Sequence, residues 1–245
     1  MIRIDKSKAN VPAILRAGNK GEIATQELIQ LYDGGRRDFK PTDFSSVIYG
    51  NKTVKSLLLV IQHGKCCFCE QKRPHGREGD VEHFRPKTGF QIDRTASLQK
   101  PGYYWLAYDF ENLFYTCKVC NQEYKKNFFP LVDETKRALS HKDDWKNEES
   151  LILHPGLDDP SDHIEFVEEI AKPKAGSSKG KVTIQLVGLN DPKLAEERLK
   201  YLKPLKILSA FAREGHKESQ DYFKEIGKDY HLFSLMVRCN FPDLV

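Results

Sequence analysis

Long apolar runs are missing from this 245-residue chain. The longest near the start, Leu57–Ile61, has five residues, whereas a membrane-spanning helix needs about 18 or more. The first ten residues, MIRIDKSKAN, also lack the apolar stretch of a signal peptide. Neither an internal repeat nor a low-complexity segment is visible. We therefore expect a cytoplasmic protein without a membrane partner.

A strong excess of charge is missing too. The chain has 39 Lys and Arg against 35 Asp and Glu, a formal net charge of +4. This balance permits a nucleic-acid partner without requiring one. Hydrophobic residues make up 39% of the chain, which is enough for a core and too much for a disordered protein. The length fits one large domain, or one domain with a smaller appendage.

Cysteine is scarce and unevenly placed, with six residues of which five fall in two clusters. A secreted disulfide scaffold would spread its cysteines along a short chain. Here two C-x2-C pairs are separated by 47 residues, a pattern typical of a zinc site in a reducing compartment. The predicted ligands are Cys66, Cys69, Cys117 and Cys120. Four thiolates leave no open position for water, so the zinc is expected to be structural.

Other residues near these pairs offer weaker alternatives. Cys67 could replace Cys66, but its spacing to Cys69 would then be only C-x-C. His63 and His75 flank the first pair and could compete as ligands. Cys239 stands alone in an apolar helical context, which favours a place in the core.

The pattern of apolar residues predicts an α+β protein with three regions, 1–63, 64–189 and 190–245. The first is expected to be helical, with helices at 22–32 and 52–64. Ile23, Leu28 and Leu31 are expected near one face of the first helix. The middle region is expected to contain a strand near 81–84 and a β-hairpin over 164–189, with a lysine-rich tip at 172–181. The third is expected to contain a helix starting at Pro192, kinked at Pro204, and a last helix over 217–238.

Polar residues of a recognisable order lie between and beside the cysteine pairs. Residues 80–87 read DVEHFRPK, and residues 111–121 read ENLFYTCKVCN. The order of an acid-His pair, an Asn, and an Asn directly after the last cysteine resembles the HNH (ββα-metal) endonuclease family. The resemblance implies a zinc-stapled, treble-clef-like ββα-metal core between an N-terminal and a C-terminal helical region.

The same resemblance implies a role for each polar residue. Phosphodiester hydrolysis needs a water nucleophile, a base and a cation that stabilises charge on phosphate. His83 is implied as the general base, while Glu82 and Asn121 are implied to hold a catalytic Mg²⁺ or Mn²⁺. Asn112 is implied to hydrogen-bond backbone and orient the histidine loop. The family usually has Asp where this chain has Glu82, and Asp80 is an alternative carboxylate.

Basic and aromatic residues around the motif give two further hypotheses. The basic side chains expected to contact phosphate, rather than to be merely solvated, are Arg85, Lys87, Lys125 and Lys126. Seven aromatic residues lie between Tyr103 and Tyr115, both included. Such a run can stack on bases, but it more often packs a small core around a metal site.

A narrower resemblance extends over about residues 60–200. The segments EHFRPK, GYYWLAYDFENLFYTCKVCN, YKKNFFPL and LILHPGLDDPSDHIEF are similar to the HNH nuclease subunits of Septu-type and retron-associated anti-phage systems. This resemblance implies a complex with an ABC-type ATPase, and DNA or tRNA as the target. The alternative is a non-catalytic zinc module that binds nucleic acid or a protein, but it does not explain Glu82 and His83 together with Asn121.

Overall fold

The computed structural model describes residues 1–72 and 79–245, and it confirms an α+β architecture in these ranges. Short 3-10 turns connect the main elements. In chain order these are α1 (Lys20–Asp33), α2 (Ser46–Tyr49), α3 (Lys52–Ile61), β1 (Gly79–His83), β2 (Leu113–Cys117), the π-helix η6 (Val119–Lys125), β3 (Ile164–Val167), β4 (Ile170–Pro173), α4 (Ser178–Leu186), α5 (Pro192–Arg213), α6 (Lys217–Ile226) and α7 (Ser234–Asn240).

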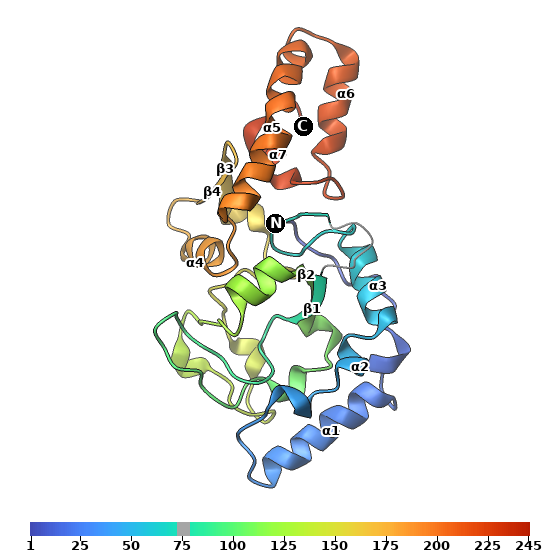
Figure 1. Cartoon of the computed structure of the whole chain (residues 1–245), viewed down its shortest axis with the longest axis vertical. Helices are drawn as coiled ribbons and strands as arrows, with labels where there is room; N and C mark the ends of the chain where they lie inside the picture. The colour runs from blue at the N-terminus through green and yellow to red at the C-terminus, as the bar shows by residue number, and fades with distance from the viewer. Residues whose placement is uncertain (73–78) are drawn as a thin grey trace.

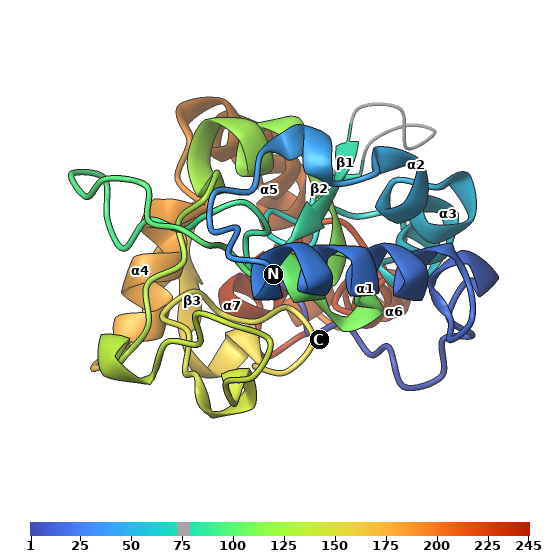
Figure 2. The ribbon, with the colours of Figure 1, turned by 90° about the horizontal axis from the view of Figure 1, so that it is seen from below.

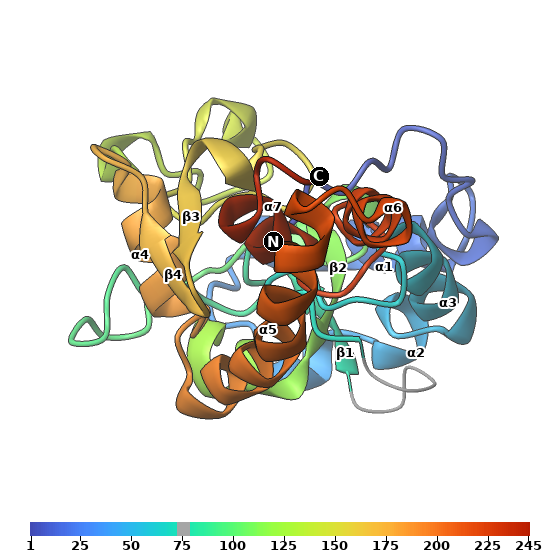
Figure 3. The same cartoon turned by 90° about the horizontal axis from the view of Figure 1, so that it is seen from above.

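Strands β1 and β2 lie near the centre of the molecule, and helices surround them (Figure 1). The α5–α6 hairpin projects at one end of the long axis, and α1 lies at the opposite end. Views along that axis place α2 and α3 on one flank, with α4, β3 and β4 on the other (Figures 2 and 3). The two flanks therefore enclose the central strand pair.

The central strands pair antiparallel, with His83 opposite Leu113 and Gly79 opposite Cys117. One end of the pair therefore carries the candidate base, and the other leads into the second cysteine pair. Gly79 is required at its position, because a Cβ there would lie 2.5 Å from the Tyr115 ring. All five residues of β2 are buried.

The N-terminal helices match their predicted positions, but one predicted face is wrong. Val54 and Leu58 of α3 pack with Leu113 of β2 in a small apolar cluster. The three residues of α1 that were predicted near one face differ in exposure, because Leu28 is buried while Ile23 is 54% and Leu31 42% exposed. Each residue of an α-helix turns the chain by about 100°. Leu28 and Leu31 therefore lie about 140° and about 80° around the helix axis from Ile23, so the three side chains are spread over a wide part of the helix surface.

The predicted hairpin over 164–189 is wrong in its second half. The true hairpin is short, β3 with β4, and Ser178–Leu186 is helix α4 instead of a returning strand. The Ser177 side chain caps this helix by accepting a hydrogen bond from the Gly180 amide at 2.9 Å. The alternation of Val182, Ile184 and Leu186 suggested a strand, but short segments of this kind fit either period.

The C-terminal helices also differ from the prediction in one place. α5 starts at Pro192 and contains Pro204, as predicted. The single helix predicted over 217–238 is two helices, α6 and α7, separated by a loop that ends at Phe233 with φ of 51°. A non-glycine residue in the left-handed region interrupts an α-helix, which explains the break.

A buried network ties the C-terminal helices to the loop of the first cysteine pair. The Glu70 carboxylate pairs with Lys65 at 2.9 Å and with the Met1 ammonium at 2.8 Å. It also accepts a hydrogen bond from the Ser234 hydroxyl, at the start of α7, at 2.9 Å. The two basic groups and the hydrogen bonds hold the pKa of Glu70 well below its usual range, despite burial that acts to raise it.

Candidate functional site

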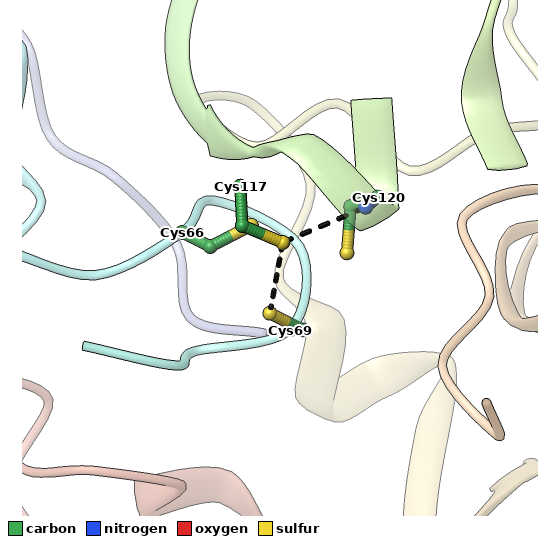
Figure 4. A group of neighbouring side chains, drawn as sticks. All are labelled: Cys66, Cys69, Cys117 and Cys120. Atoms are coloured by element: carbon green, nitrogen blue, oxygen red, sulfur yellow. Dashed lines mark hydrogen bonds between the residues drawn. The ribbon is translucent and has the colours of Figure 1, made fainter. Parts of the chain in front are cut away.

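The four cysteines predicted as ligands converge in the structure. Their sulfur atoms all lie within 4.8 Å of one another, and all four residues are buried. Figure 4 shows the sulfurs pointing toward one another, from the loop before β1, from the end of β2 and from the first turn of η6. The Sγ atoms of Cys69 and Cys117 lie 3.8 Å apart. The edge of a tetrahedron with Zn–S bonds of about 2.3 Å is also about 3.8 Å, so this set fits a zinc ion.

The thiol chemistry agrees with a cation site. Burial acts to raise the pKa of the Cys66 thiol, but hydrogen bonds with Cys117 and Cys120 lower it well below its usual range. Hydrogen bonds with Cys117 raise the pKa of Cys69 and of Cys120. Four thiols this close ionise together only around a cation, which supports metal binding.

The alternative ligands lie elsewhere or outside the described residues. Cys67 is not part of the four-sulfur cluster, and burial raises the pKa of its thiol. His63 is exposed and packs edge-on against Tyr230. His75 lies outside the residues that the structure describes. Cys239 is half-buried and packs against the core.

A cleft of about 640 Å³ lies beside β1. Three parts of the chain form it: the α2–α3 region, β1 with the loop that follows it, and η6 with the residues that follow. The lining includes Tyr49, Lys55, Asp80, Glu82, His83, Lys87, Asn121 and Lys126. The cleft thus brings together Glu82, His83 and Asn121, the three residues named from the sequence as base and metal ligands.

His83 is the last residue of β1 and is buried. Its Nε2 lies 2.9 Å from the Ala107 carbonyl oxygen, which can only accept, so Nε2 carries the hydrogen. Nδ1 then keeps its lone pair, 3.3 Å from the Lys87 ammonium. Burial, with added repulsion from Lys87, lowers the pKa of His83 well below its usual value. A neutral imidazole at the cleft, whose Nδ1 accepts this long hydrogen bond from Lys87, is in the protonation state that proton abstraction needs.

The carboxylate and amide predicted to bind a catalytic ion share this cleft. Glu82 is buried, and its Oε1 lies 2.6 Å from the Lys125 ammonium. Asp80 is on the same face of β1, and its carboxylate accepts a hydrogen bond from Gln122 at 2.7 Å. Carboxylate and amide oxygens are donors that Mg²⁺ and Mn²⁺ favour, so Glu82 and Asn121 fit such an ion chemically.

Asn112 lies behind the cleft and holds backbone in place. Its amide bonds to both backbone groups of Arg85, and its nitrogen also donates to the Leu106 carbonyl at 3.1 Å. Its own carbonyl accepts from the Phe84 amide at 2.9 Å. The segment directly after His83 is therefore fastened to the loop before β2.

The four predicted phosphate contacts divide into two groups. Lys87 and Lys126 line the cleft. Arg85 is buried, with its Nε 3.0 Å from a Glu148 carboxylate oxygen and its guanidinium over the Trp145 ring. Lys125 is also fully buried. The placement of Arg85 and Lys125 thus differs from that of surface groups that meet a phosphate backbone.

Sequence reasoning missed two cleft residues, Tyr49 and Lys55. Tyr49 packs edge-on against the His83 ring, with centroids 4.6 Å apart. The Lys55 ammonium donates to the Gly79 carbonyl. Neither lies in a recognisable motif, and only the folding of α2 and α3 against β1 brings them here. The aromatic run from Tyr103 to Tyr115 is buried, so its interpretation as core is confirmed.

Comparison with known proteins points to one defence system. The chain is 34% identical over 240 residues to Septu protein PtuB of Bacillus mycoides (strain KBAB4), covering 93% of this chain and 79% of that protein. It is 26% identical over 144 residues to Septu protein PtuB of Bacillus thuringiensis, covering 58% and 43%. A match to Septu protein PtuA of B. mycoides, 27% identical over 176 residues, covers 71% of this chain but 24% of PtuA. No protein-family model matches the chain. Within the described residues, no helix is long and apolar enough to cross a membrane.

Proposed function

The chain belongs to the PtuB family of Septu anti-phage defence proteins, and from this premise we propose that it is a metal-dependent HNH endonuclease. The observation that supports this most is the His83 imidazole, neutral and oriented, in one cleft with Glu82 and Asn121. We assign β1, β2 and η6 to a ββα-metal unit, stapled by a structural zinc on Cys66, Cys69, Cys117 and Cys120. The substrate is a phosphodiester of DNA or tRNA.

Each residue has a distinct task in this proposal. His83 takes a proton from the attacking water at Nδ1, while the Ala107 carbonyl fixes the ring through Nε2. Lys87 and Lys126 bind the phosphate backbone along the cleft. Glu82 and Asn121 hold a divalent ion, which when bound supplies positive charge for the phosphate and the leaving oxygen. Asn112 keeps the histidine loop in position.

We also propose that the protein works in the cytoplasm as the effector subunit of a complex with an ABC-type ATPase. The α5–α6 hairpin is the proposed docking element, because it projects from the molecule (Figure 1). It also exposes Ile207 (68%) and Phe211 (51%), one helical turn apart. Exposed apolar side chains on a projecting element suit a protein interface.

A cleavage assay tests the nuclease. Wild type, His83→Ala and the exposed control His63→Asn are each incubated with plasmid DNA and with tRNA, with Mg²⁺, Mn²⁺ or EDTA. We expect wild type and His63→Asn to cleave one substrate class only with metal, and His83→Ala to lose at least about 100-fold in rate. Full activity in His83→Ala would refute the base assignment.

The same assay on the complex with the ATPase separates the alternative function. A silent isolated subunit that becomes active in the complex supports a nuclease that needs its partner. Silence in both, with zinc and fold intact, favours a non-catalytic zinc module that binds nucleic acid or protein.

A further inference from the structure

Lys125 is the most deeply buried charged group beside the cleft. Its side chain is fully buried, and its ammonium lies 2.6 Å from Glu82 Oε1 and 3.3 Å from the His83 carbonyl oxygen. The cation is therefore in contact with the carboxylate proposed to bind the catalytic ion. The proposed hydrolysis assigns no role to Lys125.

The local backbone places Lys125 and Asn121 together. Both lie in η6, a π-helix in which the Lys126 amide donates to the Asn121 carbonyl at 2.8 Å. Residues four apart in such a helix are close to one full turn apart, so they face nearly the same side. Lys126 then ends the element with φ of 44°, outside helical geometry. The same turn thus carries Asn121, which is one proposed metal ligand, and Lys125, which pairs with the other proposed ligand, Glu82.

An ammonium and a divalent ion compete at this carboxylate. An ion bound to a Glu82 oxygen at about 2.1 Å would lie within a few ångströms of the Lys125 ammonium. In a buried site with little screening, two cations this close repel strongly. At the same time, a buried carboxylate without any cation is costly. The repulsion between two cations and the cost of an unpaired carboxylate together favour one cation at a time on Glu82.

We propose that Lys125 is a positioning residue that holds the place of the divalent ion on Glu82. The metal binds only when the Lys125 ammonium leaves the carboxylate, so Lys125 sets the metal affinity of the resting site. This inference rests on the proposed metal site at Glu82 and Asn121. The contrasting arrangement is a permanent ion pair, in which the metal would bind without displacing Lys125.

Metal affinity, measured apart from cleavage, tests the inference. Mn²⁺ binding is followed by electron paramagnetic resonance in wild type, Lys125→Met, Lys125→Arg and the exposed cleft variant Lys126→Met. We expect Lys125→Met to bind Mn²⁺ about tenfold more tightly or better, because the competing cation is gone. Lys125→Arg keeps a competing charge and should stay near wild type, and Lys126→Met should change affinity by less than about threefold. Equal or weaker binding in a folded Lys125→Met protein overturns the inference.

A measurement on wild type covers the case in which Lys125→Met does not fold. Crystals soaked in MnCl₂ are expected to show an anomalous peak at Glu82, with the Lys125 ammonium moved away from its 2.6 Å contact. Manganese at Glu82 with the ion pair intact overturns the inference alone. Mn²⁺ binding by none of the folded proteins overturns both the inference and the metal-dependent nuclease.

Discussion

Asn112 holds the backbone of Arg85 from both sides. Its Oδ1 accepts from the Arg85 amide at 2.7 Å, and its Nδ2 donates to the Arg85 carbonyl at 3.1 Å. Arg85 is two residues beyond His83, so this pair of bonds fixes the path of the chain where the strand carrying the candidate base ends. We therefore expect the orientation of His83 to depend on this amide, which lies behind the cleft.

Replacing Asn112 with Ala should reduce both stability and cleavage. The substitution removes the partners of the buried Arg85 amide and carbonyl and one of the two hydrogen bonds to the Leu106 carbonyl, and we expect the free energy of unfolding to fall by about 2–4 kcal/mol. Urea denaturation gives this value, and Asn147→Ala, at an exposed asparagine, should stay within about 0.5 kcal/mol of wild type. An unchanged urea midpoint for Asn112→Ala would contradict the role given to this side chain.

Cys117→Ser should remove zinc and destabilise the region around the strand pair. Metal affinity at a site of this kind is largely folding energy, so losing one of four thiolates lowers both together. Inductively coupled plasma mass spectrometry measures zinc per chain, and thermal melts measure stability. Cys67→Ser, outside the four-sulfur cluster, is the control and should retain zinc. Equal zinc content in Cys117→Ser and wild type would exclude the four-cysteine site.

Arg85 and Lys126 should respond differently to substitution because their surroundings differ. Arg85→Met leaves the Glu148 carboxylate buried without its cation, which typically costs about 3–5 kcal/mol of stability. Lys126→Ala should leave stability nearly unchanged, weaken nucleic-acid binding and lower its salt dependence by about one counterion. Denaturation and binding titrations at several salt concentrations measure the two effects. The reverse pattern would mean that Arg85 is the nucleic-acid contact.

Acid should destabilise the protein through His154. Burial and the nearby Arg85 lower the pKa of His154 to about 3. The unfolded chain therefore binds a proton below about pH 6.5 that the folded chain does not, and stability falls as pH falls. From pH 6.5 to pH 5 this histidine should cost about 2 kcal/mol. His154→Gln should flatten the dependence of the unfolding free energy on pH by that amount, and an unchanged slope would show that His154 is not the group responsible.

Local patterns were sufficient to predict much of the site. A short turn brings together the two cysteines of each C-x2-C pair, and the pairing of β1 with β2 brings the two pairs together. Glu82, His83 and Asn121, which were named from the sequence, line one cleft. What could not be predicted was which side of these elements each lysine or arginine would take. Lys125 and Lys126 are adjacent, yet one is fully buried and the other exposed, because η6 turns sharply between them.

Tertiary packing explains the other differences. Residues 182–186 alternate like a strand, but Ser177 caps a helix whose buried face contains Gly180, Thr183 and Ile184. Tyr49 of α2 and Lys55 of α3 enter the cleft only because this helical region packs on the strand pair, a contact that no local pattern encodes.

Docking through the α5–α6 hairpin can be tested without deleting the C-terminal region. Leu235, Met236 and Val237 of α7 are buried, and Ser234 bonds to Glu70, so removing residues 190–245 would expose core. Phe211→Asp instead changes only an exposed position, and we expect it to reduce co-purification of the ATPase at least about tenfold, since a charge at the centre of an apolar contact is costly. Val132→Asp, at a side chain 54% exposed outside the helical regions, is the matched control and should leave the complex intact. If the ATPase still co-purifies with a double Ile207→Asp, Phe211→Asp variant that remains folded, the docking surface lies elsewhere, and Ile23→Asp on α1 is the next substitution to compare.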